Sequence, residues 1–122
     1  MEKTIMIVDN SASMRAMVSI AFRGEGYAVI EATNGQEAIR KLDDQRMHLI
    51  ICDIYMPVMD GITFVKNVKQ MPVHCFTPII ILTTEFEEYK KRQGQAAGAK
   101  AWVIKPFRRE QMLKVAQKLC LP

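Results

Sequence analysis

Side chains that could handle a phosphoryl group stand at the ends of four short apolar runs. Asp9 and Asn10 follow the first run, Asp53 ends another, and Thr83 and Lys105 stand at the ends of two more. Carboxylate and amide oxygens bind hard cations, and Mg²⁺ usually takes one or two carboxylates while keeping water or phosphate oxygens. An Asp can also be a nucleophile that becomes an aspartyl-phosphate, and a hydroxyl and an ammonium stabilise phosphoryl oxygens. These residue types predict phosphoryl transfer if the fold brings them together.

Each of these residues also has a structural explanation when it is taken alone. An Asp or Asn that follows a strand usually caps the next helix through its side-chain oxygen. Ser11 and Ser13 could cap the helix that follows the first apolar run, which leaves Asp9 and Asn10 available for a metal. The functional hypothesis therefore depends on the combination of residues and on the elements that position them.

The apolar pattern predicts five buried strands, each followed by an amphipathic helix. The strands are expected at Thr4 to Val8, Tyr27 to Ala32, Leu49 to Asp53, Pro78 to Thr83 and Ala101 to Ile104. The helices are expected around Met14, Met17, Val18 and Ala21; around Ala38, Ile39 and Leu42, with Asn34 and Glu37 as caps; around Ile62, Val65 and Val68; from about Phe86 to Ala97; and around Met112, Leu113, Ala116 and Leu119.

Nearly continuous apolar strands that alternate with helices indicate a parallel sheet covered on both faces. The predicted fold class is therefore a doubly wound α/β domain. In such sheets ligands bind beyond the carboxyl ends of the strands, where the strand order reverses. We expect Asp9, Asn10, Asp53, Thr83 and Lys105 to meet at that edge.

Composition excludes several other classes of protein. The chain has 122 residues, enough for one domain. No apolar run approaches the ~20 residues of a membrane span, and no signal peptide precedes the first strand. The three cysteines have no metal-binding spacing, which is typical of a reduced, cytoplasmic protein. Although the net charge is +4, the basic residues are scattered and not interleaved with aromatic residues, so direct binding of nucleic acid is not expected.

Other kinds of phosphate or catalytic site lack their motifs. There is no Walker GxxxxGK[ST] sequence, and Gly24 and Gly26 follow a helix rather than the first strand, which disfavours nucleotide and dinucleotide binding. His48 and His74 lie outside any catalytic motif. Both histidines are interpreted as solvated or core side chains.

With these residues identified, the chain resembles the receiver domains of two-component response regulators over essentially its whole length. The matching segments are IVDNS at Asp9, ICDIYMPVMDG at Asp53, IILTTE at Thr83 and GAKAWVIKPF at Lys105. The resemblance implies a flavodoxin-like sheet with the strand order 2-1-3-4-5. It also implies that residues 1–122 form a single stand-alone receiver of the chemotaxis (CheY-like) type, with no output domain.

The resemblance further implies the role of each site residue. Asp53 would accept a phosphoryl group from a phosphohistidine of a sensor histidine kinase, with Mg²⁺ as cofactor. Asp9, Asn10, Asp53 and the backbone carbonyl of Tyr55 would surround the metal. Thr83 and Lys105 would hold phosphoryl oxygens. Thr83 and Trp102 would act as switch residues. Pro106 would follow a cis peptide bond.

A receiver of this kind is a signalling phosphoacceptor rather than an enzyme, and it catalyses only its own phosphorylation and slow dephosphorylation. Its output would be binding to a downstream protein through the fourth helix, the fifth strand and the fifth helix, bordered by Lys90, Lys91, Arg108 and Arg109. A monomer in the cytoplasm, neither inserted into the membrane nor bound to nucleic acid, is expected.

Asn10 departs from the family pattern, in which two acidic residues commonly stand in succession. An amide oxygen can still coordinate a cation, but one negative charge is missing. Two unit charges ~4 Å apart interact by about 4 kcal/mol at an effective dielectric constant near 20, before desolvation is subtracted. We therefore expect a Mg²⁺ site weakened by about 1 to 2 kcal/mol, or roughly five- to thirtyfold in affinity.

Two alternatives follow from these residues. A pseudo-receiver would keep the fold and bind partners without being phosphorylated, which Asn10 favours and the presence of Asp53, Thr83 and Lys105 opposes. A phosphohydrolase of the haloacid dehalogenase kind would also use an Asp nucleophile after a strand. Such enzymes carry a second carboxylate two residues later, where this chain has Tyr55.

Two further residues are expected to modulate the site. Tyr55 follows the proposed nucleophile by two residues, and we predict that its side chain shields the phosphoryl group from water. Glu85 follows Thr83 by two residues. Trp102 stands where Tyr or Phe is commoner in the family, and its size makes inward rotation more demanding.

Overall fold

The computed structural model describes residues 2–43 and 45–120. The strands are β1 (Thr4–Val8), β2 (Ala28–Ala32), β3 (Leu49–Cys52), β4 (Ile79–Thr83) and β5 (Ala101–Ile104). The helices that follow them are α1 (Ala12–Arg23), α2 (Gly35–Leu42), α3 (Gly61–Lys69), α4 (Glu88–Ala97) and α5 (Arg109–Leu119). This alternation is the one that the apolar pattern predicts. None of the helices in the described ranges has the length and apolar character needed to cross a membrane.

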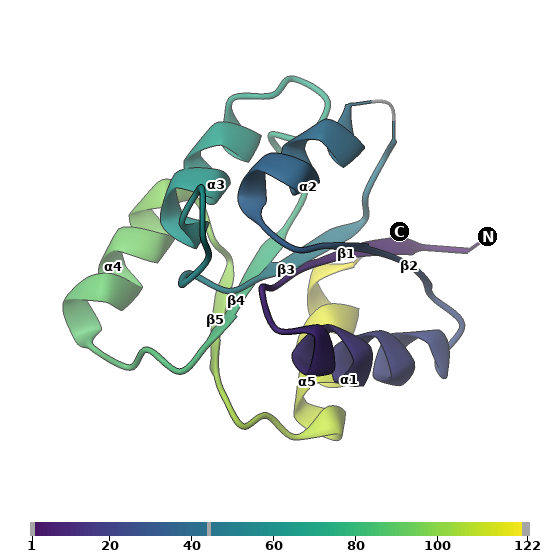
Figure 1. Cartoon of the computed structure of the whole chain (residues 1–122). Helices are drawn as coiled ribbons and strands as arrows, with labels where there is room; N and C mark the ends of the chain where they lie inside the picture. Colours follow the sequence, from purple (N-terminus) through teal and green to yellow (C-terminus); the bar gives the residue numbers. More distant parts are fainter. Residues whose placement is uncertain (1, 44, 121–122) are drawn as a thin grey trace.

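The strands form one parallel sheet in the order β2-β1-β3-β4-β5 (Figure 1). Because β2 pairs with one side of β1 and β3 with the other, the strand order reverses between β1 and β3. The last residues of these two strands, Val8 and Cys52, are partners in the register. Asp9 and Asp53 therefore leave the sheet side by side at its carboxyl edge.

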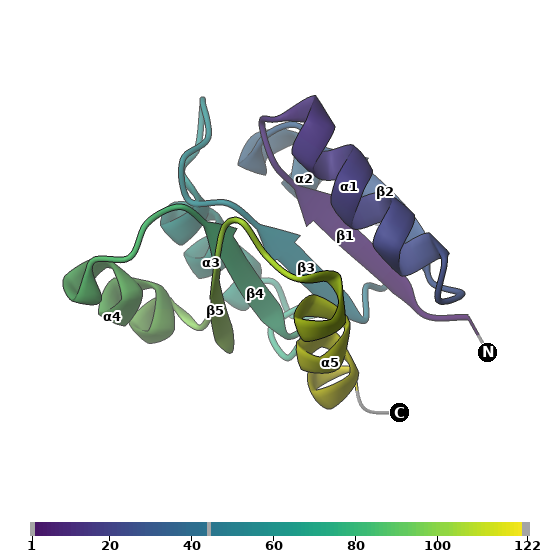
Figure 2. The same ribbon diagram turned by 90° about the horizontal axis from the view of Figure 1, so that it is seen from below.

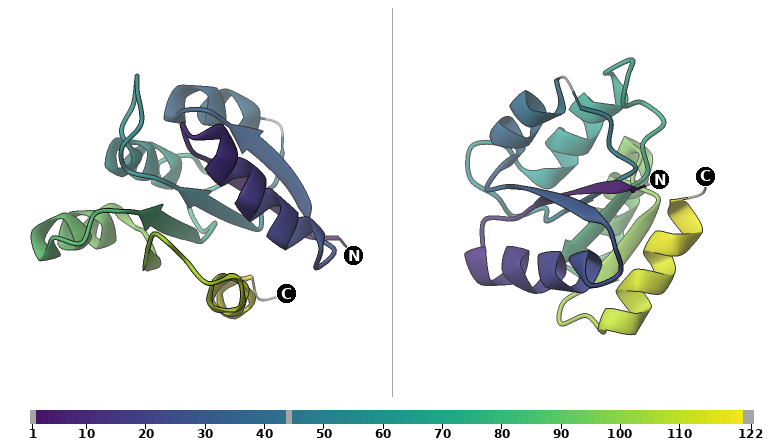
Figure 3. Two further views of the ribbon diagram at one scale, coloured as in Figure 1. Left: turned by 60° about the horizontal axis from the view of Figure 1, so that its bottom comes forward. Right: turned by 90° about the vertical axis from the view of Figure 1, so that its right-hand side faces the viewer.

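Two layers of helices cover the two faces of the sheet, α1 and α5 on one and α2, α3 and α4 on the other (Figures 1 and 3). Figure 2 looks from the side of α1 and α5. Side chains of β1 alternate between the two cores: Met6 and Val8 pack on the side of α2 and α3, whereas Ile5 and Ile7 pack on the side of α1 and α5. Every residue of β3 and β4 is buried, so the strand ends that carry the site are fixed by both cores.

Three expected strand boundaries shift by one residue, because Tyr27, Asp53 and Pro78 lie just outside β2, β3 and β4. Two larger details also differ from the periodicity-based expectation. Helix α4 begins at Glu88 rather than near Phe86, because Glu85 forms local hydrogen bonds with the backbone N–H of Glu87 and with Thr83 Oγ1 that compete with helix formation. Met17 was expected in the apolar stripe of α1, but its side chain is 57% exposed. The helix instead buries Val18, Ala21 and Phe22, and Met17 lines a surface pocket together with Phe107 and Arg109.

Candidate functional site

The turn after β1 holds Asp9 in a fixed orientation. Asp9 is 4% exposed, and its Oδ1 accepts the N–H of Ser11 at 2.8 Å. Ser11 is the N-cap of α1, since its Oγ accepts the N–H of Met14 at 3.2 Å. Because Ser11 performs the capping, the second carboxylate oxygen of Asp9 remains free to face the neighbouring strand ends.

Arg15 supports the same turn from within α1. Its Nη1 donates to the backbone carbonyl of Asp9 at 2.6 Å, and its Nε lies 3.3 Å from the carboxylate of Glu31 in β2. No sequence motif marks Arg15 as part of the site. An arginine one turn after a helix N-cap is too common a feature to indicate such a contact by itself.

Asp53 stands directly after β3, where its backbone N–H donates to Val8 O at 3.1 Å. Its carboxylate Oδ1 accepts the N–H groups of Ile54 and Tyr55 at 2.7 and 3.2 Å. The following loop returns so close that a Cβ on Gly61 would lie 2.1 Å from the carbonyl oxygen of Asp53. Only glycine fits this approach, so Gly61 at the start of α3 helps to fix the chain around Asp53.

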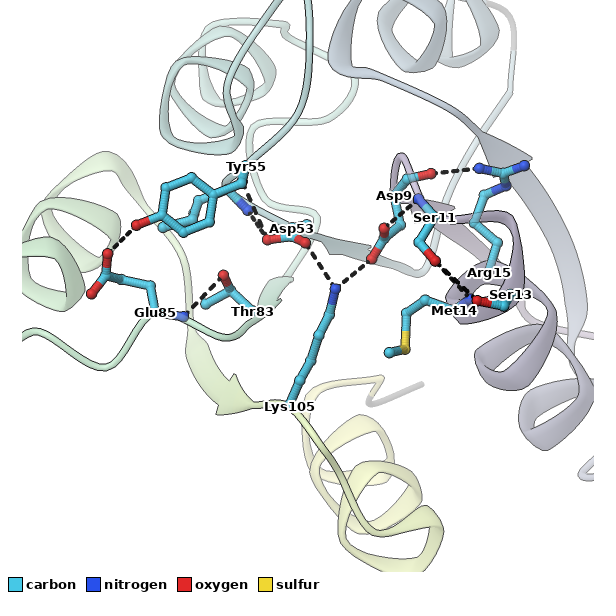
Figure 4. A network of polar contacts seen from close by, with 11 residues as sticks. Asp9, Ser11, Ser13, Met14, Arg15, Asp53, Tyr55, Thr83, Glu85 and Lys105 are labelled. Carbon is cyan, nitrogen blue, oxygen red and sulfur yellow. Dashed lines mark hydrogen bonds and ion pairs between the residues drawn. The ribbon is translucent and has the colours of Figure 1, made fainter.

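Lys105 brings the two carboxylates together (Figure 4). Its Nζ lies 2.9 Å from Asp9 Oδ2 and 2.8 Å from Asp53 Oδ2. The three side chains are between 5% and 12% exposed, and the Lys105–Pro106 peptide bond is cis. Burial would lower the pKa of the Lys105 ammonium, but its hydrogen bonds to Asp53 and Asp9 outweigh burial and raise this pKa. The ammonium is therefore firmly charged at neutral pH.

Thr83 ends β4 with its side chain fully buried. Its Oγ1 accepts the N–H of Glu85 at 3.3 Å, which leaves the hydroxyl proton available for donation. The backbone N–H of Lys105 donates to the carbonyl of Thr83 at 2.8 Å. Thr83 and Lys105 therefore reach the carboxyl edge from adjacent strands.

Tyr55 and Glu85 form a bridge on the solvent side of this cluster (Figure 4). The hydroxyl of Tyr55, a side chain that is 54% exposed, donates to Glu85 Oε1. The bond to the Glu85 carboxylate raises the pKa of Tyr55 to about 12, and the bond from Tyr55 lowers the pKa of Glu85. The bridge links the loop after β3 to the loop after β4.

Trp102 of β5 is connected to the same loop. Its Nε1 donates to the backbone carbonyl of Glu85 at 2.9 Å. The indole packs against α4 at Gly94, where an added Cβ would lie 2.7 Å from Cζ3 of Trp102 and 2.9 Å from Cδ1 of Ile81. The role of Gly94 was not anticipated, although a glycine inside a helix costs roughly 0.5 to 1 kcal/mol relative to alanine and so marks a position with a special packing demand.

The residues expected to hold a metal offer a suitable set of oxygen ligands. Asp9 and Asp53 supply carboxylates at adjacent strand ends, and Asn10 is exposed beside them. No group of three or more His, Cys, Asp or Glu side chains that could hold a metal occurs in residues 2–43 and 45–120. The residue after Asp9 is the amide Asn10 rather than a third carboxylate. Two carboxylates with an amide match the hard-cation chemistry of Mg²⁺, with less charge than three carboxylates would give.

The two histidines lie outside this cluster. His74 is 1% exposed, and its Nε2 is 2.8 Å from the backbone carbonyl of Leu42. His48 is partly buried, with Nδ1 accepting the N–H of Thr4 at 3.0 Å. Both have structural partners, as expected for core or partly solvated histidines.

Comparison with known proteins identifies a family over nearly the whole chain. The response regulator receiver domain model matches residues 5–117. Transcriptional regulatory protein ResD of Bacillus subtilis is 38% identical over 115 residues, which cover 93% of this chain and 47% of ResD. The chain thus spans about half the length of the curated relatives it matches.

Solved structures agree with the observed strand order. The chemotaxis protein CheY4 of Vibrio cholerae is 43% identical, with a TM-score of 0.93 over 98% of this chain and 99% of that one. The receiver domain of sensor histidine kinase PA1611 from Pseudomonas aeruginosa, solved with magnesium in its active-site cleft, has a TM-score of 0.91 at 24% identity over 98% of both chains. The first comparison confirms the flavodoxin-like expectation, and the second supports the fold alone.

Proposed function

Since the chain belongs to the response regulator receiver domain family, the signalling modules of two-component systems, we propose that Asp53 is its phosphoacceptor. The main structural support for this proposal is that Lys105 Nζ lies within 2.9 Å of oxygens of both Asp9 and Asp53. A buried ammonium beside a carboxylate that follows a strand is suited to neutralise a phosphoryl group as it arrives.

The two oxygens of Asp53 have different environments, which suggests which one reacts. Oδ1 accepts two backbone N–H groups, whereas Oδ2 faces Lys105. In the proposed step, Oδ2 attacks phosphorus, the bond between phosphorus and the histidine nitrogen of the donor breaks, and its electron pair stays on the imidazole, which takes up a proton. Lys105 then passes from Oδ2 to a phosphoryl oxygen, and the Thr83 hydroxyl donates to another.

Mg²⁺ is part of this proposal. Asp9, Asn10, Asp53 and the backbone carbonyl of Tyr55 would hold the ion, which would supply positive charge to the phosphoryl oxygens when bound. Arg15 contributes indirectly, because its bond to the Asp9 carbonyl and its contact with Glu31 fix the turn that aims the Asp9 carboxylate.

A pseudo-receiver remains the second candidate because of one observation. Lys105 bonds to the carboxylates of both Asp9 and Asp53, so it competes with a cation for them. Asn10 adds no third carboxylate that would help the cation to bind. A receiver that keeps this arrangement would bind its partners without accepting a phosphoryl group.

The proposed partners are a sensor histidine kinase and a downstream protein that contacts α4, β5 and α5. The support for the second surface is the bond of Trp102 Nε1 to the Glu85 carbonyl, two residues from Thr83. Movement of Thr83 toward a phosphoryl group would disturb this loop and the face of α4 above it. We also propose that the protein is a monomer and that it lies in the cytoplasm. A reducing compartment agrees with the free thiols of Cys52, Cys75 and Cys120.

The experiment is incubation with Mg²⁺ and acetyl phosphate, followed by intact-mass analysis for one added phosphoryl group that is stable in acid and labile in base. Asp53→Asn should abolish the modification. Asp60→Asn is the matched control, because Asp60 is an exposed N-cap of α3 and Asn also caps well. No modification at saturating Mg²⁺ would favour the pseudo-receiver, and continuous phosphate release over many turnovers would indicate a hydrolase.

A further inference from the structure

The connection between α3 and β4 exposes two large apolar side chains far from the carboxyl edge. Val73 is 71% exposed and Phe76 is 94% exposed. Phe76 lies three residues before Ile79, the first residue of β4, so this connection lies at the amino ends of the strands, opposite Asp53. The phosphoacceptor site does not use these residues.

The segment that carries them is firmly anchored. His74, between Val73 and Phe76, is 1% exposed, and its ring Nε2 bonds to the carbonyl of Leu42 at 2.8 Å. Lys69 Nζ donates to the carbonyls of Thr77 at 2.6 Å and Cys75 at 3.2 Å. Phe76 therefore stands exposed on a segment fixed on both sides, rather than at the tip of a loop without contacts.

A groove of about 240 Å³ lies beside Phe76. Val73, Phe76, Pro78 and Leu119 form its apolar walls, and Arg46 and His48 line it as well. This volume is below the roughly 300 to 1,000 Å³ of sites that enclose small molecules. Its size fits one or two side chains of a protein segment.

The charge of the groove indicates which segment it would accept. No carboxylate lines it among the described residues. Arg46 contributes a guanidinium, and His48 uses Nδ1 to accept the N–H of Thr4, so its neutral ring carries a proton on Nε2 as a second donor. Two donors beside an apolar wall complement a carboxylate that stands next to an apolar side chain.

We propose that this groove is a docking site for a segment of a partner protein in which an apolar side chain stands next to a carboxylate. The exposed Phe76 and Val73 would pack on the apolar side chain, and Arg46 with His48 would bond to the carboxylate. A second copy of this chain is a poorer occupant, because a symmetric contact through this face would bring Arg46 of each copy toward the other.

The test uses two acetylated, amidated tetrapeptides that differ only in charge. One has leucine and phenylalanine between two glutamates, and the other has lysines in place of the glutamates. Amide chemical shifts of the full chain are followed during titration. The acidic peptide should bind with a Kd of about 1 mM and shift the amides of His48, Phe76 and Thr77. The lysine peptide should not.

Variants then locate the contact. Phe76→Ala and Arg46→Gln should each weaken binding about fivefold or more. Phe86→Ala is the matched control, since Phe86 is a 79% exposed phenylalanine in the loop before α4 and should leave the affinity unchanged. Asp53→Asn should also bind normally, so the result is independent of the proposed phosphoacceptor role.

Several outcomes would overturn the proposal. These are equal binding of the two peptides, no local shifts at about 10 mM acidic peptide, or an equal loss in Phe86→Ala. Concentration-dependent dimerisation that Phe76→Ala abolishes would instead identify a second copy as the occupant. Binding to anionic phospholipid vesicles through Phe76 and Arg46 would identify a membrane surface.

Discussion

The hydroxyl of Tyr55 donates a hydrogen bond to the carboxylate of Glu85, thirty residues further along the chain. This bond joins the loop that carries the proposed phosphoacceptor to the loop that carries Thr83. Glu85 also accepts the indole N–H of Trp102 through its backbone carbonyl. One residue thus connects the opening of the site to the proposed partner surface on β5 and α4.

Replacing Tyr55 should shorten the lifetime of the phosphorylated protein. We predict that the Tyr55 ring covers the approach to Asp53, so its removal in Tyr55→Asn should make phosphate loss about tenfold faster, the equivalent of about 1.4 kcal/mol in the barrier. Phosphate release after removal of the donor measures this rate. Tyr89→Asn is the control, because Tyr89 is equally exposed at 54% but lies on α4. If Tyr55→Asn loses phosphate no faster than the wild type, Tyr55 does not shield the group.

The ionisation of Tyr55 should report its bond to Glu85. Because this bond raises the pKa of Tyr55 from the ordinary value of 10.0 to about 12, its contribution to stability is complete below pH 10.0 and is lost as the pH rises toward about 12. Glu85→Gln should return the pKa toward 10.0. Tyrosinate absorbance of the wild type, Glu85→Gln and Tyr55→Phe isolates this transition, and identical curves for the wild type and Glu85→Gln would exclude the bond in solution.

Removing the ammonium of Lys105 should destabilise the fold and increase its response to Mg²⁺. Lys105→Met leaves two buried carboxylates without their cation, which should lower the free energy of unfolding by about 3 kcal/mol in Mg²⁺-free buffer at neutral pH. Urea denaturation with and without Mg²⁺ measures both effects.

Added Mg²⁺ should restore more stability in this variant than in the wild type. Lys66→Met is the control, because Lys66 is an exposed lysine of α3. An equal response to Mg²⁺ in the wild type and in Lys105→Met would show that lysine and cation do not compete.

Restoring a carboxylate at position 10 should strengthen the metal site. For Asn10→Asp we expect Mg²⁺ binding to be stronger by about 1 to 2 kcal/mol, or roughly five- to thirtyfold in affinity. Titration monitored by the fluorescence of Trp102, the single tryptophan of the chain, gives the affinity. Asn34→Asp makes the same chemical change at the N-cap of α2 and should not alter it. Unchanged affinity in Asn10→Asp would remove residue 10 from the ligand set.

The packing of the Trp102 indole against α4 should require glycine at position 94. Alanine is the better helix former, but its Cβ would lie 2.7 Å from the indole, so Gly94→Ala should destabilise the protein by about 1 to 3 kcal/mol. It should also shift Trp102 emission toward that of an exposed indole. The exposed Gln95→Ala in the same helix should do neither. A Gly94→Ala protein with unchanged stability and emission would show that the indole does not occupy this position.

Periodicity was sufficient for much of the fold, and strand-end chemistry was sufficient to propose candidate site residues. Buried runs such as Ile79–Thr83 predict strands because every residue is apolar or small, and a parallel sheet puts all their carboxyl ends on one edge. Their positions at these strand ends alone make Asp9, Asp53, Thr83 and Lys105 candidates for a phosphoryl-binding site. Periodicity failed at Met17 and at the start of α4, where tertiary cover and local hydrogen bonds decided the outcome.

The sequence by itself therefore determined which elements form and which polar side chains reach the carboxyl edge, because these follow from the period of the chain and from neighbouring residues. Only the tertiary structure decided that Lys105 bonds to both Asp9 and Asp53, that Tyr55 meets Glu85, and that the indole of Trp102 lies against Gly94. These contacts join residues up to 96 positions apart. They depend on the register of adjacent strands and on the rotamers of long side chains, which local pattern does not specify.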